Sequence, residues 1–248
     1  QEDKVGFLFS GGIDSTTILS FFSRYDIQNK KLYAYTAKFN HIEDSIKNRI
    51  DESEFQAEIF NTLDVKDRSF ETEKLSTISN LDFYLDLIGQ PFFFPNLFLP
   101  HKTFKKAKTD GVTKVFNGCD GDTVISHGFE YFEELFLNLK WFKLYNQIDK
   151  LSRNINLSKR SIFKRTVLGL LFYEKKLFFN SKDKHKQILS TPIHSNSIEV
   201  ESLLADYYGV EEVYPFYNID LINYCINVKP DLKINGYTRY IIREAIKG

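Results

Sequence analysis

The stretch SGGIDS, Ser10–Ser15, decides the fold because of what stands on either side of it. The apolar run KVGFLF at Lys4–Phe9 predicts a strand, and Asp14–Tyr25 carries apolar residues at helical spacing, which predicts a helix. Gly11 and Gly12 let the main chain approach an anion without a Cβ in the way, and the N–H groups at the helix start converge on the same place. The sequence therefore predicts a loop that cradles a nucleotide pyrophosphate.

The side chains of this loop suit the same ligand. Ser10 and Ser15 add hydroxyl donors, and Asp14 in the first helical turn can hold the Mg²⁺ that accompanies pyrophosphate. No GK[ST] follows the glycines, so this is not a Walker loop. The alternative is an ordinary strand-to-helix turn with Asp14 or Ser15 as its N-cap. The position of the glycines, between a strand and a helix, favours the phosphate loop.

Strands and helices continue to alternate after the loop. Further strands are predicted at Lys31–Ala37 and Val112–Phe116, the second being the last clear strand of the sequence. Helices are predicted between them at Glu43–Leu63, Glu73–Ile88 and Thr103–Asp110, with Gly111 as the C-cap of the last. This alternation indicates an α/β fold with a doubly wound parallel sheet.

Beyond Gly128 the pattern changes to long amphipathic stretches, Tyr131–Leu151 and Ile162–Phe179, which predict a mainly helical C-terminal half. We expect a single domain over residues 1–248, with a nucleotide-binding α/β core at 1–128 and a helical part at 129–248 that completes the active site. The basic runs Lys102–Lys108 and Lys182–Lys186 are interpreted as solvated surface.

Composition argues against several classes of partner and compartment. The chain has 33 Lys and Arg and 33 Asp and Glu, so no net field draws it to nucleic acid or to an anionic membrane. Cys119 and Cys225 are too far apart in sequence to suggest a disulfide framework or a zinc site, which favours a cytoplasmic setting. The longest apolar stretches, such as Val167–Tyr173, are too short to span a bilayer. Because the sequence starts at Gln1 and contains no methionine, we expect it to be part of a longer polypeptide.

Three ordered segments resemble one family. SGGIDS matches the SGGxDS signature of the ATP-pyrophosphatase (PP-loop) superfamily, and VFNGCDGDT at Val115–Thr123 is similar to a strand followed by SGEGADE. The third match resembles GVExRxPFLD, PPELKI and KYILRE, and its parts are Gly209–Glu211, Pro215–Asn218, Pro230–Ile234 and Tyr240–Glu244. Over nearly its whole length the chain thus resembles the synthetase domain of the asparagine synthetase and β-lactam synthetase family, and it is also similar to lasso-peptide cyclases.

The resemblance implies an adenine nucleotide alpha hydrolase-like fold and an amide-forming ligase. Such an enzyme adenylates an Asp or Asp-like carboxylate of a small molecule or peptide with ATP and Mg²⁺. It then passes the acyl group to ammonia or another amine, releasing AMP and pyrophosphate. Asp14 and Asp122 are implied as the metal ligands. The implied ATP-binding residues are Leu8, Ser10, Gly11, Gly12, Asp14, Ser15, Thr36, Ala37, Asn117 and Gly118.

The chain departs from the family pattern at positions expected to be catalytic. Cys119 aligns with the glutamate of GEGAD, and Asp120 beside it is the expected substitute. Arg239 aligns with the family's catalytic lysine, and it keeps the charge but cannot donate a proton near neutral pH. Asn218 and Val213 replace the aspartate of PFLD and the arginine of GVExR. We therefore take Arg239, Asp120 and Cys119 as the catalytic candidates.

Several alternatives stay open at this point. The amine could belong to the substrate itself, as in the β-lactam synthetase and lasso-peptide cyclases, or the chain could be a non-catalytic adenine-nucleotide-binding module. In full-length relatives ammonia comes from a glutaminase domain, and nothing in this sequence resembles that domain. Cys119 could be a nucleophile, although a buried small residue fits better. His127 either lines the substrate pocket or starts a helix, and the remaining histidines have no metal-ligand spacing.

Overall fold

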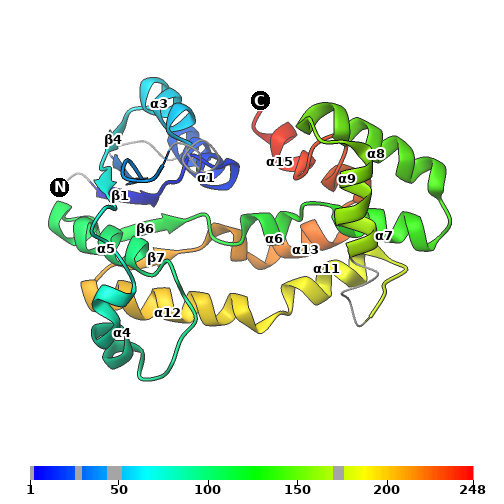
Figure 1. Ribbon diagram of the computed structural model, residues 1–248. Helices are drawn as coiled ribbons and strands as arrows, with labels where there is room; N and C mark the ends of the chain where they lie inside the picture. Colours follow the sequence, from blue (N-terminus) through cyan, green and yellow to red (C-terminus); the bar gives the residue numbers. More distant parts are fainter. Residues whose placement is uncertain (1–2, 26–29, 44–51, 170–175, 248) are drawn as a thin grey trace. The chain divides into compact units, whose positions relative to one another are not determined.

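The structure, a computed structural model, describes residues 3–25, 30–43, 52–169 and 176–247 (Figure 1). The chain divides into two compact units. Unit 1 comprises Gln1–Cys119 and Pro192–Pro215, and unit 2 comprises Asp120–Thr191 and Phe216–Gly248. The chain leaves unit 1 after Cys119 and later returns to it with one helix and one strand, so each unit combines segments that are far apart in the sequence. The predicted division into a core at 1–128 and a helical part at 129–248 stays a prediction.

Unit 1 is built on a parallel sheet. Among the described residues this sheet has five strands in the order β4-β2-β1-β6-β7, every neighbouring pair being parallel. The strands are β1 (Asp3–Leu8), β2 (Lys30–Tyr35), β4 (Val65–Asp67), β6 (Lys114–Asn117) and β7 (Glu211–Val213). A second, two-stranded pair joins β3 (Ala37–Lys38) to β5 (Phe70–Glu71). Along the chain, strands are added on both sides of the central strand β1, as in a doubly wound sheet, so the predicted fold class is confirmed.

Helices pack on both faces of this sheet because its strands alternate apolar side chains between the faces. In β2, Leu32 and Ala34 belong to one buried cluster, whereas Tyr33 and Tyr35 belong to another. The first cluster includes residues of α1 (Ile13–Tyr25) and α3 (Ser53–Thr62), and the second includes residues of α4 (Leu81–Ile88), α5 (Phe98–Asp110) and α12 (Pro192–Tyr208). Each face of the sheet therefore has its own hydrophobic core.

The predicted helices of unit 1 differ from the observed ones at their ends. The helix predicted at Glu73–Ile88 is wrong over its first half, where only the short helix η1 (Ile78–Asn80) precedes α4. The helix expected from Thr103 starts five residues earlier, at Phe98, and ends at the left-handed cap Gly111 as predicted. Residues 44–51 of the predicted helix Glu43–Leu63 lie outside the described residues. The strand β7 was not predicted, because three residues are too few to show a period.

Unit 2 is helical in its described residues, as expected. Its elements are α6 (Gly121–Ile125), α7 (Phe129–Leu137), α8 (Trp141–Ile155), α9 (Lys159–Phe163), the π-helical turn η2 (Lys164–Leu168), α11 (Ser181–Leu189), α13 (Ile219–Asn227), α14 (Pro230–Lys233) and α15 (Tyr240–Ala245). The helix predicted over Tyr131–Leu151 is broken between α7 and α8, where Leu139 has a φ of 56°. Part of the stretch predicted at Ile162–Phe179 lies outside the described residues. A short helix, η3 (Pro215–Tyr217), spans the last passage from unit 1 to unit 2.

The described helices include none that is long and apolar enough to cross a membrane.

Candidate active site

Three strands of unit 1 end in one row. Leu8 at the end of β1 is paired in register with Tyr35 of β2 on one side and with Asn117 of β6 on the other. The N–H of Phe9 donates to the carbonyl of Tyr35 at 3.0 Å and extends this row by one residue. The loops that follow these strands therefore leave the same edge of the sheet, which is where open α/β sheets bind ligands.

The SGGIDS loop is held by hydrogen bonds within itself. The N–H of Gly12 donates to Ser10 Oγ at 3.1 Å, and Ser15 Oγ lies 3.2 Å from Ser10 Oγ and 3.1 Å from the carbonyl of Gly12. Thr16 Oγ1 donates to the carbonyl of Gly11 at 3.2 Å. These bonds fix the turn just before α1, whose first turn carries Asp14. The serines thus act as internal supports of the loop as well as possible donors to a phosphate.

The glycine of this loop that has a positive φ lies against α3, a contact that the sequence did not predict. Gly11 has a φ of 94°, and a Cβ there would lie 2.9 Å from Gln56 Cγ and 3.1 Å from the carbonyl oxygen of Glu52. Gln56 of α3 also donates through Nε2 to the carbonyl of Ser10 at 2.5 Å. A side chain at position 11 would be strained in both its backbone and its surroundings. Sequence reasoning missed Glu52 and Gln56, because the helical pattern around them carries no sign of a contact with the loop.

The loop after β6 packs on the same turn. A Cβ on Gly118 would lie 3.1 Å from the backbone nitrogen of Ser15 and 3.4 Å from the carbonyl carbon of Asp14. Only a glycine allows the two backbones to approach this closely without displacing one of them. Asn117 and Gly118, which were predicted to be near the nucleotide, are thus brought beside the SGGIDS loop.

A cavity of about 210 Å³ opens at this edge of unit 1. Of the predicted ATP-binding residues, Leu8, Ser10 and Ala37 line it, together with Glu52 and Gln56. Its volume is below the roughly 300–1,000 Å³ typical of sites for drug-sized ligands, so it can hold part of a nucleotide. Thr36 does not line the cavity and is completely buried, with a hydroxyl that has no hydrogen-bond partner among the described residues. A buried hydroxyl of this kind is one that a ligand can satisfy.

The side chain of Asn117 faces the protein interior. Its amide nitrogen donates to Glu201 Oε2 at 2.8 Å and to Glu212 Oε1 at 2.7 Å, while its Oδ1 accepts from the N–H of Cys119 at 2.9 Å. The hydroxyl of Tyr214 lies 2.6 Å from Glu212 Oε2 and 3.2 Å from Glu201 Oε2. Asn117 therefore links the loop that contains Cys119 to two carboxyl groups from the returning segment, and only its backbone remains for a nucleotide.

These two carboxyl groups are expected to share a proton. Burial raises the pKa of Glu212 above its usual value of 4.5, against the opposing effect of its hydrogen bonds with Tyr214, Asn117 and Glu201. Burial and the neighbouring carboxylates likewise raise the pKa of Tyr214, so this phenol stays a donor. Two ionised carboxylates side by side in a poorly hydrated place repel each other, which favours one neutral member.

Replacing Glu212 by glutamine is expected to flatten the dependence of stability on pH. A raised carboxyl pKa means that the native state loses stability as pH rises from the usual value of 4.5 through the raised one, because the unfolded chain ionises first. Glu212→Gln removes this titration, so the melting temperature of the variant should rise relative to that of the wild type as the pH increases above the usual carboxyl value of 4.5. Glu211→Gln is the matched control, since Glu211 is exposed and pairs with Lys114. Parallel pH profiles for the wild type and Glu212→Gln would contradict the shared proton.

Unit 2 holds the remaining candidates. Asp120, at the N-cap of α6, accepts a hydrogen bond from the hydroxyl of Tyr217. Asp122, in the first turn of α6, pairs with His127 Nε2 at 3.4 Å. This hydrogen bond, followed by the charges of His127 and Arg239, lowers the pKa of Asp122 despite its partial burial. Arg239 stands at the N-cap of α15 and makes no side-chain capping bond. In unit 2, His127 and the charge of Arg239 thus both act on the carboxylate of Asp122.

The two interpretations of His127 were that it lines a pocket or that it stands at the start of a helix, and the structure shows features of both. His127 lines a cavity of about 180 Å³ together with Asp122, Glu130 and His185, and its ring also stacks on Phe129 at 5.8 Å in the first turn of α7.

Asn218, which replaces the family's aspartate, caps α13 by accepting from the N–H groups of two following residues. Because asparagine and aspartate cap helices about equally well, this replacement leaves the local structure intact.

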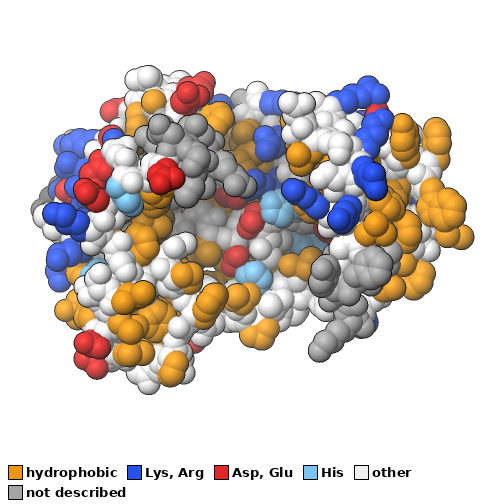
Figure 2. Space-filling model, viewed as in Figure 1, with side chains coloured by type: hydrophobic (Ala, Val, Ile, Leu, Met, Phe, Trp, Pro, Cys, Tyr) orange, Lys and Arg blue, Asp and Glu red, His pale blue; other side chains and the backbone are white. Residues whose placement is uncertain are grey.

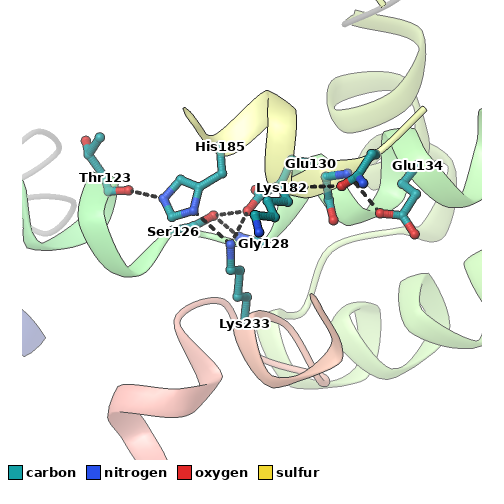
Figure 3. A network of polar contacts seen from close by, with 10 residues as sticks. Thr123, Ser126, Gly128, Glu130, Glu134, Lys182, His185 and Lys233 are labelled. Carbon is teal, nitrogen blue, oxygen red and sulfur yellow. Dashed lines mark hydrogen bonds and ion pairs between the residues drawn. The ribbon is translucent and has the colours of Figure 1, made fainter. Parts of the chain in front are cut away.

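A buried network supports the loop that carries Asp122 (Figure 3). Lys233 Nζ lies 2.8 Å from His185 Nδ1 and 3.5 Å from Glu130 Oε1, and His185 Nε2 lies 2.9 Å from the carbonyl of Thr123. Ser126 Oγ donates to the same oxygen of Glu130 at 2.5 Å. Burial is the main cause that lowers the pKa values of both Lys233 and His185. The neutral imidazole can then accept from Lys233 and donate to Thr123, which fixes its tautomer.

The interpretation of Lys182–Lys186 as solvated surface is wrong for two of its members. His185 is completely buried in the network just described, and Lys184 is 5% exposed and lies over the ring of Phe178 at 5.3 Å. These adjacent residues face inward because α11 packs against α7 and α6, which buries the side chains on its inner face even when they are charged.

Among the described residues, no group of three or more His, Cys, Asp or Glu side chains could hold a metal ion.

The predicted metal ligands, Asp14 and Asp122, belong to different units, so their joint role stays a prediction. Mg²⁺ is bound through one or two carboxylates together with phosphate oxygens, so it does not need a cluster made by the protein alone. Asp14 stands in the first turn of α1 in unit 1, and Asp122 stands in the first turn of α6 in unit 2. The structure thus brings Ser10–Ser15, Asn117, Gly118 and Cys119 together within unit 1, and it groups Asp120, Asp122 and Arg239 in unit 2.

A doubly wound sheet with a glycine loop at the carboxyl end of its central strand is typical of nucleotide-binding α/β proteins. The model of one protein family, described as asparagine synthase, matches residues 1–248, and the chain belongs to this family. It is therefore an ATP-pyrophosphatase-type amide ligase in general terms, of the kind that releases AMP and uses ATP, usually with Mg²⁺.

Other comparisons add little. No curated protein matches the sequence. Among solved structures the chain is similar to U34-tRNA thiolase NcsA from Methanococcus maripaludis with its 4Fe-4S cluster, at 13% identity and a TM-score of 0.34. The match covers 94% of this chain and 76% of the thiolase.

Proposed function

We propose that this protein adenylates an Asp or Asp-like side-chain carboxylate with ATP and passes the acyl group to ammonia or another amine. The observation that carries the proposal is the close packing of Gly118 on the SGGIDS loop, where a Cβ at position 118 would lie only 3.1 Å from the backbone nitrogen of Ser15; it joins the two segments of unit 1 that we expect to bind the nucleotide. A turn that served only to connect a strand to a helix would have no need of a glycine in a second loop. The family supports the ligase class, and the substrate is our inference.

The roles of the residues follow from the charge that develops in the reaction. Attack of a carboxylate oxygen on the α-phosphorus breaks the bond to pyrophosphate, which leaves as an anion. Backbone N–H groups of Ser10–Ser15 would bind the phosphates, and Arg239 would stabilise the departing charge. The carboxylates of Asp14 and Asp122 would hold Mg²⁺, which supplies further neutralisation of the phosphates when it is bound.

The second step needs a group that accepts a proton from the amine. As the amine nitrogen attacks the acyl carbon, the bond to AMP breaks and a proton leaves the nitrogen. Cys119 stands where the family has a glutamate, and a thiol is a poorer acceptor near neutral pH. Asp120 follows it directly, and its carboxylate is oriented by the hydroxyl of Tyr217. We therefore assign the proton to Asp120.

An intramolecular amide cyclase is the second candidate. The replacements at Cys119 and Arg239 favour it, because they change the positions of the family's glutamate and catalytic lysine and so suit a different amine acceptor. In a cyclase the amine is part of the substrate, so its position depends less on the enzyme. Both candidates require the same adenylation step.

The test follows an oxygen atom. Aspartate labelled with a heavy oxygen isotope in its side-chain carboxylate is incubated with the protein, ATP, Mg²⁺ and ammonium. We expect one labelled oxygen in AMP and an equal amount of pyrophosphate, because the carboxylate oxygen stays with the phosphorus when the amide forms. Label in AMP with a peptide carboxylate but not with aspartate would favour the cyclase. Release of pyrophosphate that no carboxylate accelerates would contradict both.

A further inference from the structure

One segment of unit 2 is strongly basic although the whole chain is neutral. Residues 140–165 hold eight Lys and Arg but a single acid, Asp149. Asp149 pairs with both Arg153 and Lys159, so the one local negative charge is already engaged. The cations of this segment that are exposed are Lys140, Lys143, Lys150, Arg153, Arg160, Lys164 and Arg165. Neutral overall composition thus conceals a local positive field on α8, α9 and η2.

The same segment, together with Phe136 of α7, lines an apolar groove, which we call the α8–α9 groove. It has a volume of about 510 Å³. Its lining consists of Phe136, Trp141, Leu144, Tyr145, Ile148 and Phe163, with Lys159 and Arg160 as the charged members. Trp141 is 60% exposed and Tyr145 is 56% exposed, which is unusual for side chains of this size. Figure 2 shows orange side chains beside blue ones over the part of the surface where Figure 1 draws α8 and α9.

Helix α8 explains why the groove stays open. Leu144, Ile148 and Leu151 are four and three residues apart and are buried against the core of unit 2. Trp141 and Tyr145 form the adjacent row, one turn apart, and this row projects past the core. Lys159 holds the ring of Tyr145 from outside, with Nζ at 2.9 Å from the hydroxyl and 4.7 Å from the ring centre. Lys159 therefore holds one aromatic wall of the groove in place.

We propose that the α8–α9 groove binds an acidic peptide segment that carries apolar side chains. Apolar side chains of the peptide would fill the space between Trp141, Ile148 and Phe163, and its Asp and Glu carboxylates would pair with Arg160 and the neighbouring cations. Grooves of this kind typically bind short segments through a few apolar anchors, and complementary charge sets their selectivity. The local excess of positive charge favours an acidic partner.

The shape of the groove favours a peptide over the other polyanions. Trp141 and Phe142 project from α8 as contact with a bilayer surface would require, but such a surface would leave the space above the buried floor of Leu144 and Ile148 unfilled. A nucleic acid would offer phosphates to the cations, but it has no small apolar side chain that would fill the space above Leu144 and Ile148. Side chains of a peptide can enter such a space one at a time.

The protein carries its own reporter for this interaction. Trp141 is the only tryptophan in the sequence, so the intrinsic tryptophan emission comes from the wall of the groove. The probe is a peptide without tryptophan in which Glu-Asp pairs alternate with Leu-Phe pairs, titrated into the full chain. We expect a saturable shift of the emission to shorter wavelength as the peptide covers Trp141. The same peptide with Lys in place of Glu and Asp should leave the emission unchanged.

A pair of matched variants separates local from general electrostatics. Arg160→Glu should lower the affinity for the acidic peptide by about tenfold, since reversing one charge at the rim of the groove costs on the order of 1 kcal/mol of binding free energy at a protein surface. Arg24→Glu is the control, because Arg24 is also exposed and is likewise the basic residue in the last turn of its helix, α1. Its affinity should equal that of the wild type. Circular dichroism confirms that both variants are folded.

Four results would overturn the proposal. The first is an emission that no acidic peptide shifts. The second is a shift produced by vesicles of anionic lipid, or by single-stranded RNA, with the same dependence on Arg160 and without an effect of the peptide. The third is a shift that grows when the protein alone is concentrated, which would assign the groove to a second copy of the chain. The fourth is equal weakening by Arg160→Glu and Arg24→Glu, which would leave only general attraction.

Discussion

Replacing Gly12 by valine is expected to lower the affinity for MgATP by about 100-fold, as the loss of two or three backbone hydrogen bonds to phosphate would. A Cβ at this position would lie 3.2 Å from Ser10 Oγ and 3.4 Å from Glu52 Oε2, so the loop can accept it after small shifts of flexible side chains. The methyl groups would then occupy the side from which phosphate oxygens must approach. Titration calorimetry with MgATP measures the effect.

Gly169→Val is the matched control for this exchange. Gly169 has a φ of −56°, and among the described residues the nearest atom to a Cβ there would be the carbonyl oxygen of Lys164 at 3.5 Å, which is an ordinary contact. This variant should keep the affinity of the wild type. Unchanged affinity in a folded Gly12→Val variant would show that the loop does not bind the phosphates.

Replacing Arg239 by alanine is expected to slow pyrophosphate release by roughly 100-fold, which is the usual effect of removing one electrostatic stabiliser from an active site. Arg239→Lys should keep a substantial fraction of the rate, because the charge remains and only the planar arrangement of donors is lost. Within unit 2 the charge of Arg239 already acts on Asp122, whose pKa it helps to lower after the hydrogen bond and charge of His127. Single-turnover measurements of pyrophosphate isolate the adenylation step.

The control for Arg239 is Arg24→Ala, which removes an exposed guanidinium from unit 1 and should leave the rate unchanged. Arg239 adopts a left-handed backbone with a φ of 52°, which asparagine or glycine would tolerate better than alanine. Folding of the variants is therefore checked by thermal melting. Equal rates in the wild type, Arg239→Ala and Arg239→Lys would remove Arg239 from the reaction and leave the charge to Arg243 or to the metal.

The parallel sheet could be predicted from sequence because its central strands are apolar on both faces and are followed by helices. Lys4–Phe9 and Lys31–Ala37 were placed within one or two residues of β1 and β2. The strand β7 could not be predicted, since its place at the sheet edge depends on pairing with β6 about one hundred residues earlier. Short elements fixed by distant partners leave no local pattern.

The predicted helix boundaries are wrong where tertiary contacts override the helical spacing of apolar residues in the sequence. The apolar residues of Glu73–Ile88 have helical spacing, yet only Ile78–Ile88 is helical and Leu75 packs on the core from a turn. Leu139 interrupts the stretch Tyr131–Leu151 with a left-handed backbone, which neither its type nor its neighbours indicate. A period in the sequence shows which residues are buried more reliably than where a helix ends.

For the candidate site, sequence could name residue types but not the directions of their side chains. The glycine loop followed from local order, and Gly118 was placed near it through the resemblance. The inward direction of Asn117 was not foreseen, because it is set by Glu201 and Glu212, both far along the chain. Lys184 and His185 were taken as solvated for the same reason, since charge alone does not reveal a buried partner such as Lys233.

The bonds of Asn117 also bear on how the protein is made. Its amide reaches acceptors 84 and 95 residues further along the chain, in a segment that the ribosome has yet to synthesise when β6 emerges. At roughly ten residues per second, the nascent loop after β6 waits about ten seconds for Glu201 and Glu212. Until then the edge of the sheet beside β6 is unpaired, and it is available to chaperones or to the wrong strand. A pause in translation between these positions would prolong this exposure in proportion.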